Sequence, residues 1–206
     1  MEILLSNDMT TDEMYNRQLA DPTAIATHME LLDRKLWLGE IDESVLDTIS
    51  RWLLIWNAED KGKPIEERKP IKIFIYSYGG DLEMCFQILG LLKCSSTPVY
   101  TYAMGVAYSA GAFIFLGGKK RYILPNTSLL IHQGSGGADG TYEQVQSQNA
   151  HYKQLIQQLK DFCLGIVDIP KQTFQKKWLK EWYLTVDEAL KYGFATDLIT
   201  DLEEVV

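Results

Sequence analysis

The fold of this chain is decided by one stretch, IKIFIYSYGGDLEMCFQILGLLK, at residues 71–93. Its first six residues are almost all β-branched or aromatic, which predicts a buried strand over 71–76. Gly79 and Gly80 then form a short turn, and apolar side chains recur at helical spacing from Leu82 to Leu92. A strand that passes through a glycine turn directly into a helix is the building unit of α/β folds.

The chain on both sides of this stretch repeats the alternation of strands and helices. Downstream, the apolar patterns predict strands over 98–103, 121–124 and 128–132 and helices over 109–116, 141–165, 171–180 and 186–192. Upstream, they predict a strand over 35–38, a helix over 43–57 and a charged exposed loop over 61–69. Such alternation favours parallel pairing with right-handed crossovers. We therefore expect one α/β domain over 34–206, preceded by a polar N-terminal arm or loop over 1–33.

The composition argues against several classes of function. A net charge of -8 and a pI near 4.9 provide no basic face for nucleic acid or an anionic membrane. The three cysteines lack metal-ligand spacing and are interpreted as buried or reduced thiols, which suits a cytoplasmic protein. The N-terminus lacks the basic and apolar regions of a signal peptide. The uncharged run 94–118 contains Pro98 and four glycines, which favours a strand, a turn and a helix over a membrane span.

Ser109 is the candidate nucleophile because it lies between small residues at a predicted strand-to-helix turn. In the run AYSAG at 107–111, little bulk surrounds the hydroxyl, so a substrate backbone can approach it closely. The helix that follows would present free N–H groups to a developing oxyanion. The alternative is a helix-capping serine in a small-residue turn. Gly79, Gly80 and Asp81 leave a similar choice between an amide exposed to a ligand and a simple turn.

His132 is the candidate general base among the three histidines. It ends an apolar strand and precedes a glycine-rich segment over 134–140, which suits a side chain that faces a cleft at the edge of the sheet. The alternative is a histidine satisfied within the core. His28 falls in the polar arm, and His151 falls on the predicted long helix, where a surface or packing role is usual. Since no histidine follows His151, the α/β-hydrolase order of catalytic residues is disfavoured.

Four motifs in order and in spacing resemble the Clp protease family between Leu36 and Asp197. The family has a Ser-Pro-Gly-Gly turn, a nucleophile within Ala-Ser-Met-Gly-Ala, a Leu-Pro-Asn-Ser turn before Ile-His-Gln, and an aromatic-Leu-Ser/Thr pattern after its acid. The counterparts here are SYGG at 77–80, YSAGA at 108–112, LPNT at 124–127 with IHQ at 131–133, and YLTVDEALKYG at 183–193. Tyr78 and Gly134 stand where the family pattern has proline.

The resemblance implies acyl transfer by a serine endopeptidase. His132 would take the proton of Ser109 as the hydroxyl attacks a peptide carbonyl, and the amides of Gly80 and Ala110 would form the oxyanion hole. The residue aligned with the family's catalytic Asp is Glu181.

Two alternatives to a catalytic Glu181 stay open. Asp168, from a loop between helices, would be the substitute acid. Glu181 would otherwise be an ordinary surface residue of a lysine-rich helix.

The resemblance also implies an architecture and an assembly. The fold would be a ClpP/crotonase-like repeated ββα core with a protruding helical handle over about 133–168. Heptameric rings would stack through the long helix, whose apolar residues recur seven apart from Val145 to Ile166. The closed chamber would cleave unfolded polypeptides or short peptides without using ATP itself, and an ATPase unfoldase would feed it. No cofactor or metal is implied.

Two rival functions stay open. A crotonase-like acyl-CoA enzyme shares the ββα core but would not need a serine and a histidine together. A catalytically inactive ring subunit, acting as scaffold or regulator, is the rival from a different class. The presence of Ser109 and His132 argues against it, and the Glu181 substitution argues mildly for it.

Overall fold

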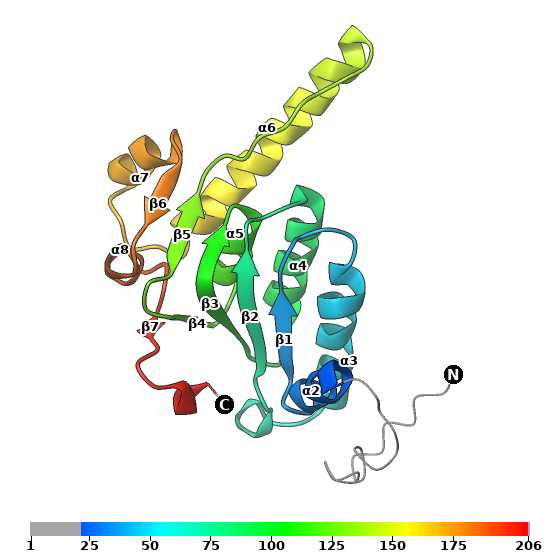
Figure 1. Cartoon of the computed structure of the whole chain (residues 1–206). Coiled ribbons are helices and arrows are strands. Elements are labelled where there is room, and N and C mark those ends of the chain that lie inside the picture. The colour runs from blue at the N-terminus through cyan, green and yellow to red at the C-terminus, as the bar shows by residue number, and fades with distance from the viewer. Residues whose placement is uncertain (1–21, 206) are drawn as a thin grey trace. The chain divides into compact units, whose positions relative to one another are not determined.

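The computed structural model describes residues 22–205 (Figure 1). The contacts within the chain divide it between Lys35 and Leu36 into two compact units.

The first unit contains helix α2 (Pro22–Leu32), where the sequence predicted an arm or loop. Proline is suited to the first turn of a helix, and Ile25, Met29 and Leu32 recur at helical spacing. The pattern spans only three turns among polar residues, so periodicity alone does not distinguish this helix from a loop. The rest of the predicted arm, residues 1–21, lies outside the described residues.

The second unit is built on one sheet. Within the described residues the sheet has seven strands in the order β1-β2-β3-β4-β7, with β5 paired to β3 and β6 paired to β5. The β2–β3, β3–β4, β3–β5 and β4–β7 pairs are parallel, and β5–β6 is antiparallel. The strands are β1 (Lys35–Leu38), β2 (Ile71–Ser77), β3 (Val99–Tyr108), β4 (Lys120–Ile123), β5 (Ser128–Ile131), β6 (Trp182–Leu184) and β7 (Asp197–Leu198). The predicted α/β fold is confirmed.

The helices of this unit surround a central buried helix, α5, which packs against β2, β3 and α4. Every residue of α5 is buried, because the stretch is entirely apolar. Among residues 22–205, no helix is both long and apolar enough to cross a lipid bilayer. The helices are α3 (Arg51–Glu59), α4 (Leu82–Cys94), α5 (Ala110–Leu116), α6 (Tyr142–Leu164), α7 (Lys171–Trp178) and α8 (Val186–Lys191), with a short 3₁₀ turn η3 (Leu202–Glu204) near the C-terminus.

Strand β3 is longer than the predicted 98–103 because a bulge redirects it. Its register with β2 shifts between Ile75 and Ser77, and Gly105 on β3 has a φ of 96°. Before the bulge β3 pairs with β4, and after it β3 pairs with β5. The carboxyl ends of β3 and β5 therefore lie side by side, and these are the ends that carry the predicted nucleophile and base.

The predicted helix over 43–57 begins later and in a wider form. A π-helical segment, η1 (Leu46–Ser50), precedes α3. The Ser50 hydroxyl donates to the carbonyl of Val45, five residues earlier, at 3.1 Å. This bond stabilises a turn wider than the usual α-helical one, which periodicity alone does not reveal.

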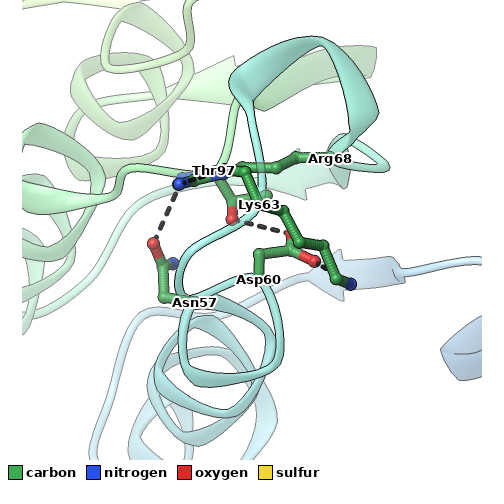
Figure 2. A network of polar contacts seen from close by, with 5 residues as sticks. All are labelled: Asn57, Asp60, Lys63, Arg68 and Thr97. Carbon is green, nitrogen blue, oxygen red and sulfur yellow. Dashed lines mark hydrogen bonds and ion pairs between the residues drawn. The ribbon is translucent and has the colours of Figure 1, made fainter.

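A polar network attaches the charged loop that follows α3, which contains the 3₁₀ turn η2 (Ile65–Glu67), to the start of β3 (Figure 2). Asp60 is buried, accepts a hydrogen bond from Thr97 Oγ1 at 2.9 Å and pairs with Lys63 Nζ at 2.8 Å. The Asn57 side chain accepts a hydrogen bond from the N–H of Thr97 at 3.1 Å. Arg68 donates to the carbonyl of Lys63 from Nε at 2.9 Å and from Nη2 at 2.7 Å. The loop is thus held from both of its ends.

Helix α6 is the long helix that the sequence predicted over 141–165. It begins with a capping box, in which the hydroxyl of Thr141 and the side chain of Gln144 accept from each other's backbone N–H. Figure 1 shows its first turns extending away from the sheet, whereas Leu159 near its C-terminal end is buried. The helix ends before Ile166, so the last member of the seven-residue stripe lies outside it.

Candidate active site

The turn after β2 is shaped by two glycines. The N–H of Ile41 donates to the carbonyl of Gly79 at 3.1 Å, and the carbonyl of Ile41 accepts from the N–H of Asp81 at 2.6 Å. A Cβ on Gly80 would collide with the Ile41 carbonyl oxygen, and a Cβ on Gly79 would lie 2.8 Å from Cβ of Ser109. The two glycines therefore let the turn lie directly against the predicted nucleophile.

Ser109 lies in the sharp turn between β3 and α5. Its φ of 54° and ψ of -124° place it in a conformation that residues other than glycine rarely adopt. Its N–H donates to the carbonyl of Leu130 on β5 at 2.9 Å, which holds the turn against the neighbouring strand. Backbone strain of this kind concentrates at functional sites. A sharp strand-to-helix turn presents its side chain at the end of the sheet, where a substrate can reach it.

His132 follows directly after β5 and meets Ser109. Its Nε2 lies 2.8 Å from the Oγ of Ser109, within hydrogen-bond distance. The side chain is 19% exposed, so the imidazole is partly shielded from water. With Nδ1 protonated, Nε2 is free to accept the serine proton. The structure thus brings the predicted nucleophile and base into proton-transfer geometry.

Glu181 is the acid that faces His132. Its Oε1 lies 3.9 Å from His132 Nδ1, and its side chain is 61% exposed. Of the carboxylates within residues 22–205, it is the one placed within ion-pair distance of this imidazole, so the geometry favours Glu181 over Asp168. Glu181 does not belong to a lysine-rich helix, because α7 ends at Trp178 and Glu181 directly precedes β6.

The register of β5 and β6 explains why this acid faces this histidine. In the antiparallel pair, Leu130 lies opposite Tyr183 and Ile131 lies opposite Trp182. The next step of the same register aligns His132 with Glu181. In the family pattern the acid precedes an aromatic residue by two positions. Here this spacing places the acid at the position of the β5–β6 register that faces His132.

The amides of Gly80 and Ala110 are oriented for a ligand. The two hydrogen bonds between Ile41 and the residues that flank Gly80 leave the N–H of Gly80 on the opposite side of the chain. Ala110 is the first residue of α5, where an N–H has no partner within the helix. Within the described residues neither amide has a recorded hydrogen bond, and both residues line the cavity at Ser109.

This cavity has a volume of about 340 Å³. Ser109 and His132 lie in its wall, and most of the remaining wall is apolar or aromatic: Tyr78, Leu82, Phe113, Leu130, Tyr152, Ile156 and Leu159. Such a lining suits an apolar side chain of a substrate.

Tyr152 is a site residue that sequence reasoning missed. Its hydroxyl donates at 2.9 Å to the carbonyl of Gln133, the residue after His132. The side chain of Gln133 donates in turn to the carbonyl of Trp178, at 3.2 Å, on α7. The seven-residue spacing predicts only that Tyr152 belongs to the apolar stripe of α6, and it does not reveal that the hydroxyl bonds the segment after His132.

The cysteines are poorly suited to catalysis. All three are free thiols, with Cys85 and Cys163 buried and Cys94 exposed. Burial raises the pKa of Cys85 to about 12 and raises the pKa of Cys163 as well, which keeps both thiols protonated at neutral pH. Within the described residues, no cluster of three or more His, Cys, Asp or Glu side chains is arranged to hold a metal ion.

Comparisons with known proteins agree with the sequence motifs. The family model described as Clp protease matches residues 23–201. The ATP-dependent Clp protease proteolytic subunit 2 of Chlamydia pneumoniae is 30% identical over 177 residues, covering 84% of each chain, and its counterpart from Chlamydia muridarum matches equally well. In fold, the chain is similar to a point mutant of ClpP1 from Listeria monocytogenes, with a TM-score of 0.74, 24% identity, and coverage of 88% of this chain and 99% of that one.

Proposed function

Because this chain belongs to the Clp protease family, we propose that it is a serine-type endopeptidase subunit with Ser109 as nucleophile and His132 as general base. The observation that carries the proposal is the 2.8 Å contact between Ser109 Oγ and His132 Nε2. It occurs in a strained strand-to-helix turn beside the amides of Gly80 and Ala110. A capping serine near a core histidine needs neither the strain nor the free amides.

In the proposed reaction, Ser109 Oγ attacks the scissile carbonyl carbon while its proton passes to Nε2 of His132. The tetrahedral intermediate collapses as the imidazolium returns that proton to the leaving amine, and an acyl ester on Oγ remains. A water molecule then attacks the ester while His132 accepts its proton, and the imidazolium returns that proton to Ser109 Oγ as the acid product leaves. Each step uses the same 2.8 Å path between the two side chains.

The oxyanion of the intermediate would be held by the N–H groups of Gly80 and Ala110. These donors are fixed by the backbone before the substrate binds, so they need no rearrangement when charge develops on the carbonyl oxygen. One such donor contributes about 3 kcal/mol to transition-state stabilisation.

Glu181 would complete the triad by stabilising the imidazolium form of His132. At 3.9 Å, its Oε1 is too far from Nδ1 for a hydrogen bond in this structure, but it is close enough to interact electrostatically. Catalytic hydrogen bonds often shorten only when substrate is bound.

We further propose that the subunits assemble into stacked heptameric rings that enclose the site. Membership of the family and the exposed first half of α6 support this part of the proposal. A relative carries the name of an ATP-dependent Clp protease proteolytic subunit, so an ATPase unfoldase is the partner to seek. The substrates would be unfolded polypeptides or short peptides.

The proposal is tested with a serine-directed fluorophosphonate and a short fluorogenic peptide. The wild-type chain should be labelled and should hydrolyse the peptide, whereas Ser109→Ala should lose labelling and His132→Ala should lose about 10⁴-fold or more in kcat. His151→Ala removes an exposed histidine on α6 and is the matched control. An assembled wild-type ring that neither labels nor hydrolyses would refute the peptidase and favour the scaffold.

A further inference from the structure

The carboxylate of Glu181 is weakly constrained for a residue with a catalytic role. Its side chain is 61% exposed, and its nearer oxygen lies 3.9 Å from His132 Nδ1. Glutamate has one more rotatable bond than the aspartate of the family pattern, so the free side chain populates more conformers. Something other than the imidazole must select the conformer that faces the base.

The Tyr183 hydroxyl makes the one hydrogen bond recorded for this carboxylate within the described residues. It donates to Glu181 Oε2 at 3.3 Å, which leaves Oε1 directed toward the imidazole. Residues two apart on a strand point to the same face, and Tyr183 lies on β6 while Glu181 directly precedes that strand. The sequence spacing of the pair therefore accounts for the contact.

The Tyr183 ring is itself held in place from the side of the nucleophile. It packs edge-to-face against Tyr108, the residue before Ser109, with ring centroids 5.7 Å apart and an interplanar angle of 85°. Tyr108 makes the same kind of contact with Tyr78, at 5.7 Å and 81°. Such contacts fix ring orientation. The hydroxyl is thus positioned relative to the same turn that carries the nucleophile.

The hydroxyl of Tyr183 stays a donor throughout the working pH range. The negative charge of Glu181 raises the pKa of Tyr183 above its ordinary value, so the phenol remains protonated near neutrality. Tyr183 is not among the residues that line the cavity at Ser109, so its hydroxyl is not part of the wall of that cavity.

We propose that Tyr183 is a positioning residue, which holds Glu181 in the conformer that supports the imidazolium of His132. The proposal rests on the proposed function in taking His132 as the base. It assigns to the tyrosine hydroxyl a role that a phenylalanine in the same strand position cannot fill. Within the described residues, Glu181 carries the one charged group in ion-pair range of the imidazole. Loss of its orientation should therefore directly reduce the stabilisation of the His132 imidazolium.

Tyr183→Phe is the test variant, because it keeps the ring packing and removes only the donor. We expect kcat to fall about fivefold with KM unchanged, since a charged hydrogen bond is lost but the cavity wall is intact. The midpoint of the pH–rate profile for fluorophosphonate labelling should move to lower pH, as it should in Glu181→Gln, because the imidazolium loses support in both variants. Tyr142→Phe removes an exposed tyrosine hydroxyl from the first turn of α6 and is the matched control.

A double-mutant cycle separates orientation from general packing. In a Glu181→Gln background, Tyr183→Phe should cause no further fall in kcat and no further shift of the profile. A full additional loss in that background would overturn the proposal, and so would a single variant Tyr183→Phe with an unchanged or upward-shifted profile.

The same variants can also be tested by a measurement that does not depend on catalytic activity. In a Ser109→Ala background with ¹³C-labelled histidine, the midpoint of the His132 ring titration should shift downward in Tyr183→Phe and in Glu181→Gln. If the His132 titration shifts in these variants but the wild-type chain hydrolyses no peptide, the proposed peptidase activity is refuted and the positioning role of Tyr183 stands. If the wild-type chain hydrolyses the peptide but the His132 titration is unchanged by Tyr183→Phe, only the positioning role of Tyr183 is refuted.

Discussion

Gly79→Ala should strongly lower the activity of the chain, although it replaces none of the proposed catalytic residues. Gly79 has a φ of 109°, which an L-residue with a Cβ adopts only under strain of about 1 to 3 kcal/mol. The added methyl would also lie 2.8 Å from the Cβ of Ser109 and 3.2 Å from the carbonyl oxygen of Tyr108. Both neighbours belong to the turn that carries the nucleophile, and neither is the flexible end of a side chain.

The expected loss of activity follows from the distance by which the added methyl and Ser109 must move apart. Carbon atoms pack at about 3.5 to 4.0 Å, so the 2.8 Å contact must open by about 1 Å. The movement is shared between the glycine turn and Ser109, which disturbs the oxyanion donor and the nucleophile together. A misplacement of this size lowers the rate of acyl transfer about 100-fold.

Gly90→Ala is the matched control, because it makes the same chemical change on the exposed side of α4. No atom lies within 4 Å of the added methyl, and alanine favours a helix interior over glycine by about 1 kcal/mol. Urea unfolding at fixed protein concentration should show Gly90→Ala more stable and Gly79→Ala less stable than the wild type. The rate constant for fluorophosphonate labelling should fall only in Gly79→Ala. A folded Gly79→Ala chain that labels at the wild-type rate would refute the close-approach reasoning.

Four further predictions concern stability, thiol access and activity. Asp60→Ala should lower the free energy of unfolding by about 2 kcal/mol in urea titrations, because it leaves the buried Thr97 hydroxyl without the carboxylate that accepts its hydrogen bond. An unchanged midpoint would contradict this. Native-state thiol labelling at pH 8 should modify Cys94 first, with the two buried thiols reacting only after unfolding. Since burial raises the pKa of Cys85 to about 12, the unfolded thiol loses its proton first, and stability should fall as pH rises from about 9 toward 12. Tyr152→Phe should lower kcat about fivefold by freeing the chain after His132 from α6, and full activity would argue against that coupling.

The proximity of the proposed catalytic pair was predictable because local chemistry, chain order and the family motifs all constrain it. A serine among small residues at a strand-to-helix turn suits either a nucleophile or a helix cap, and His132 directly follows the strand that lies beside that turn. The buried strand over 71–76 was equally clear, since β-branched residues next to a glycine turn admit few alternatives.

The features that sequence reasoning missed depend on contacts distant in the chain or on small backbone irregularities. The wide turn at Ser50 has the same apolar periodicity as an ordinary helix, and its cause is a hydroxyl bond to Val45. The partner of the Tyr183 hydroxyl could have been suspected from the spacing of two to Glu181, but only the fold shows that this spacing lies in a strand. The bond from Tyr152 to the segment after the base requires α6 to return against β5, and no local pattern encodes that path.

The backbone angle at Ser109 bears on the evolutionary history of chains of this kind. With a φ of 54°, this corner favours glycine over serine by about 1 kcal/mol, so a serine at this position is held at the expense of stability. A lineage that kept the subunit only for its shape would drift toward glycine here, since that single replacement relaxes the corner and spares its neighbours. The residue found at this corner in related chains is therefore a marker of whether hydrolysis is still under selection.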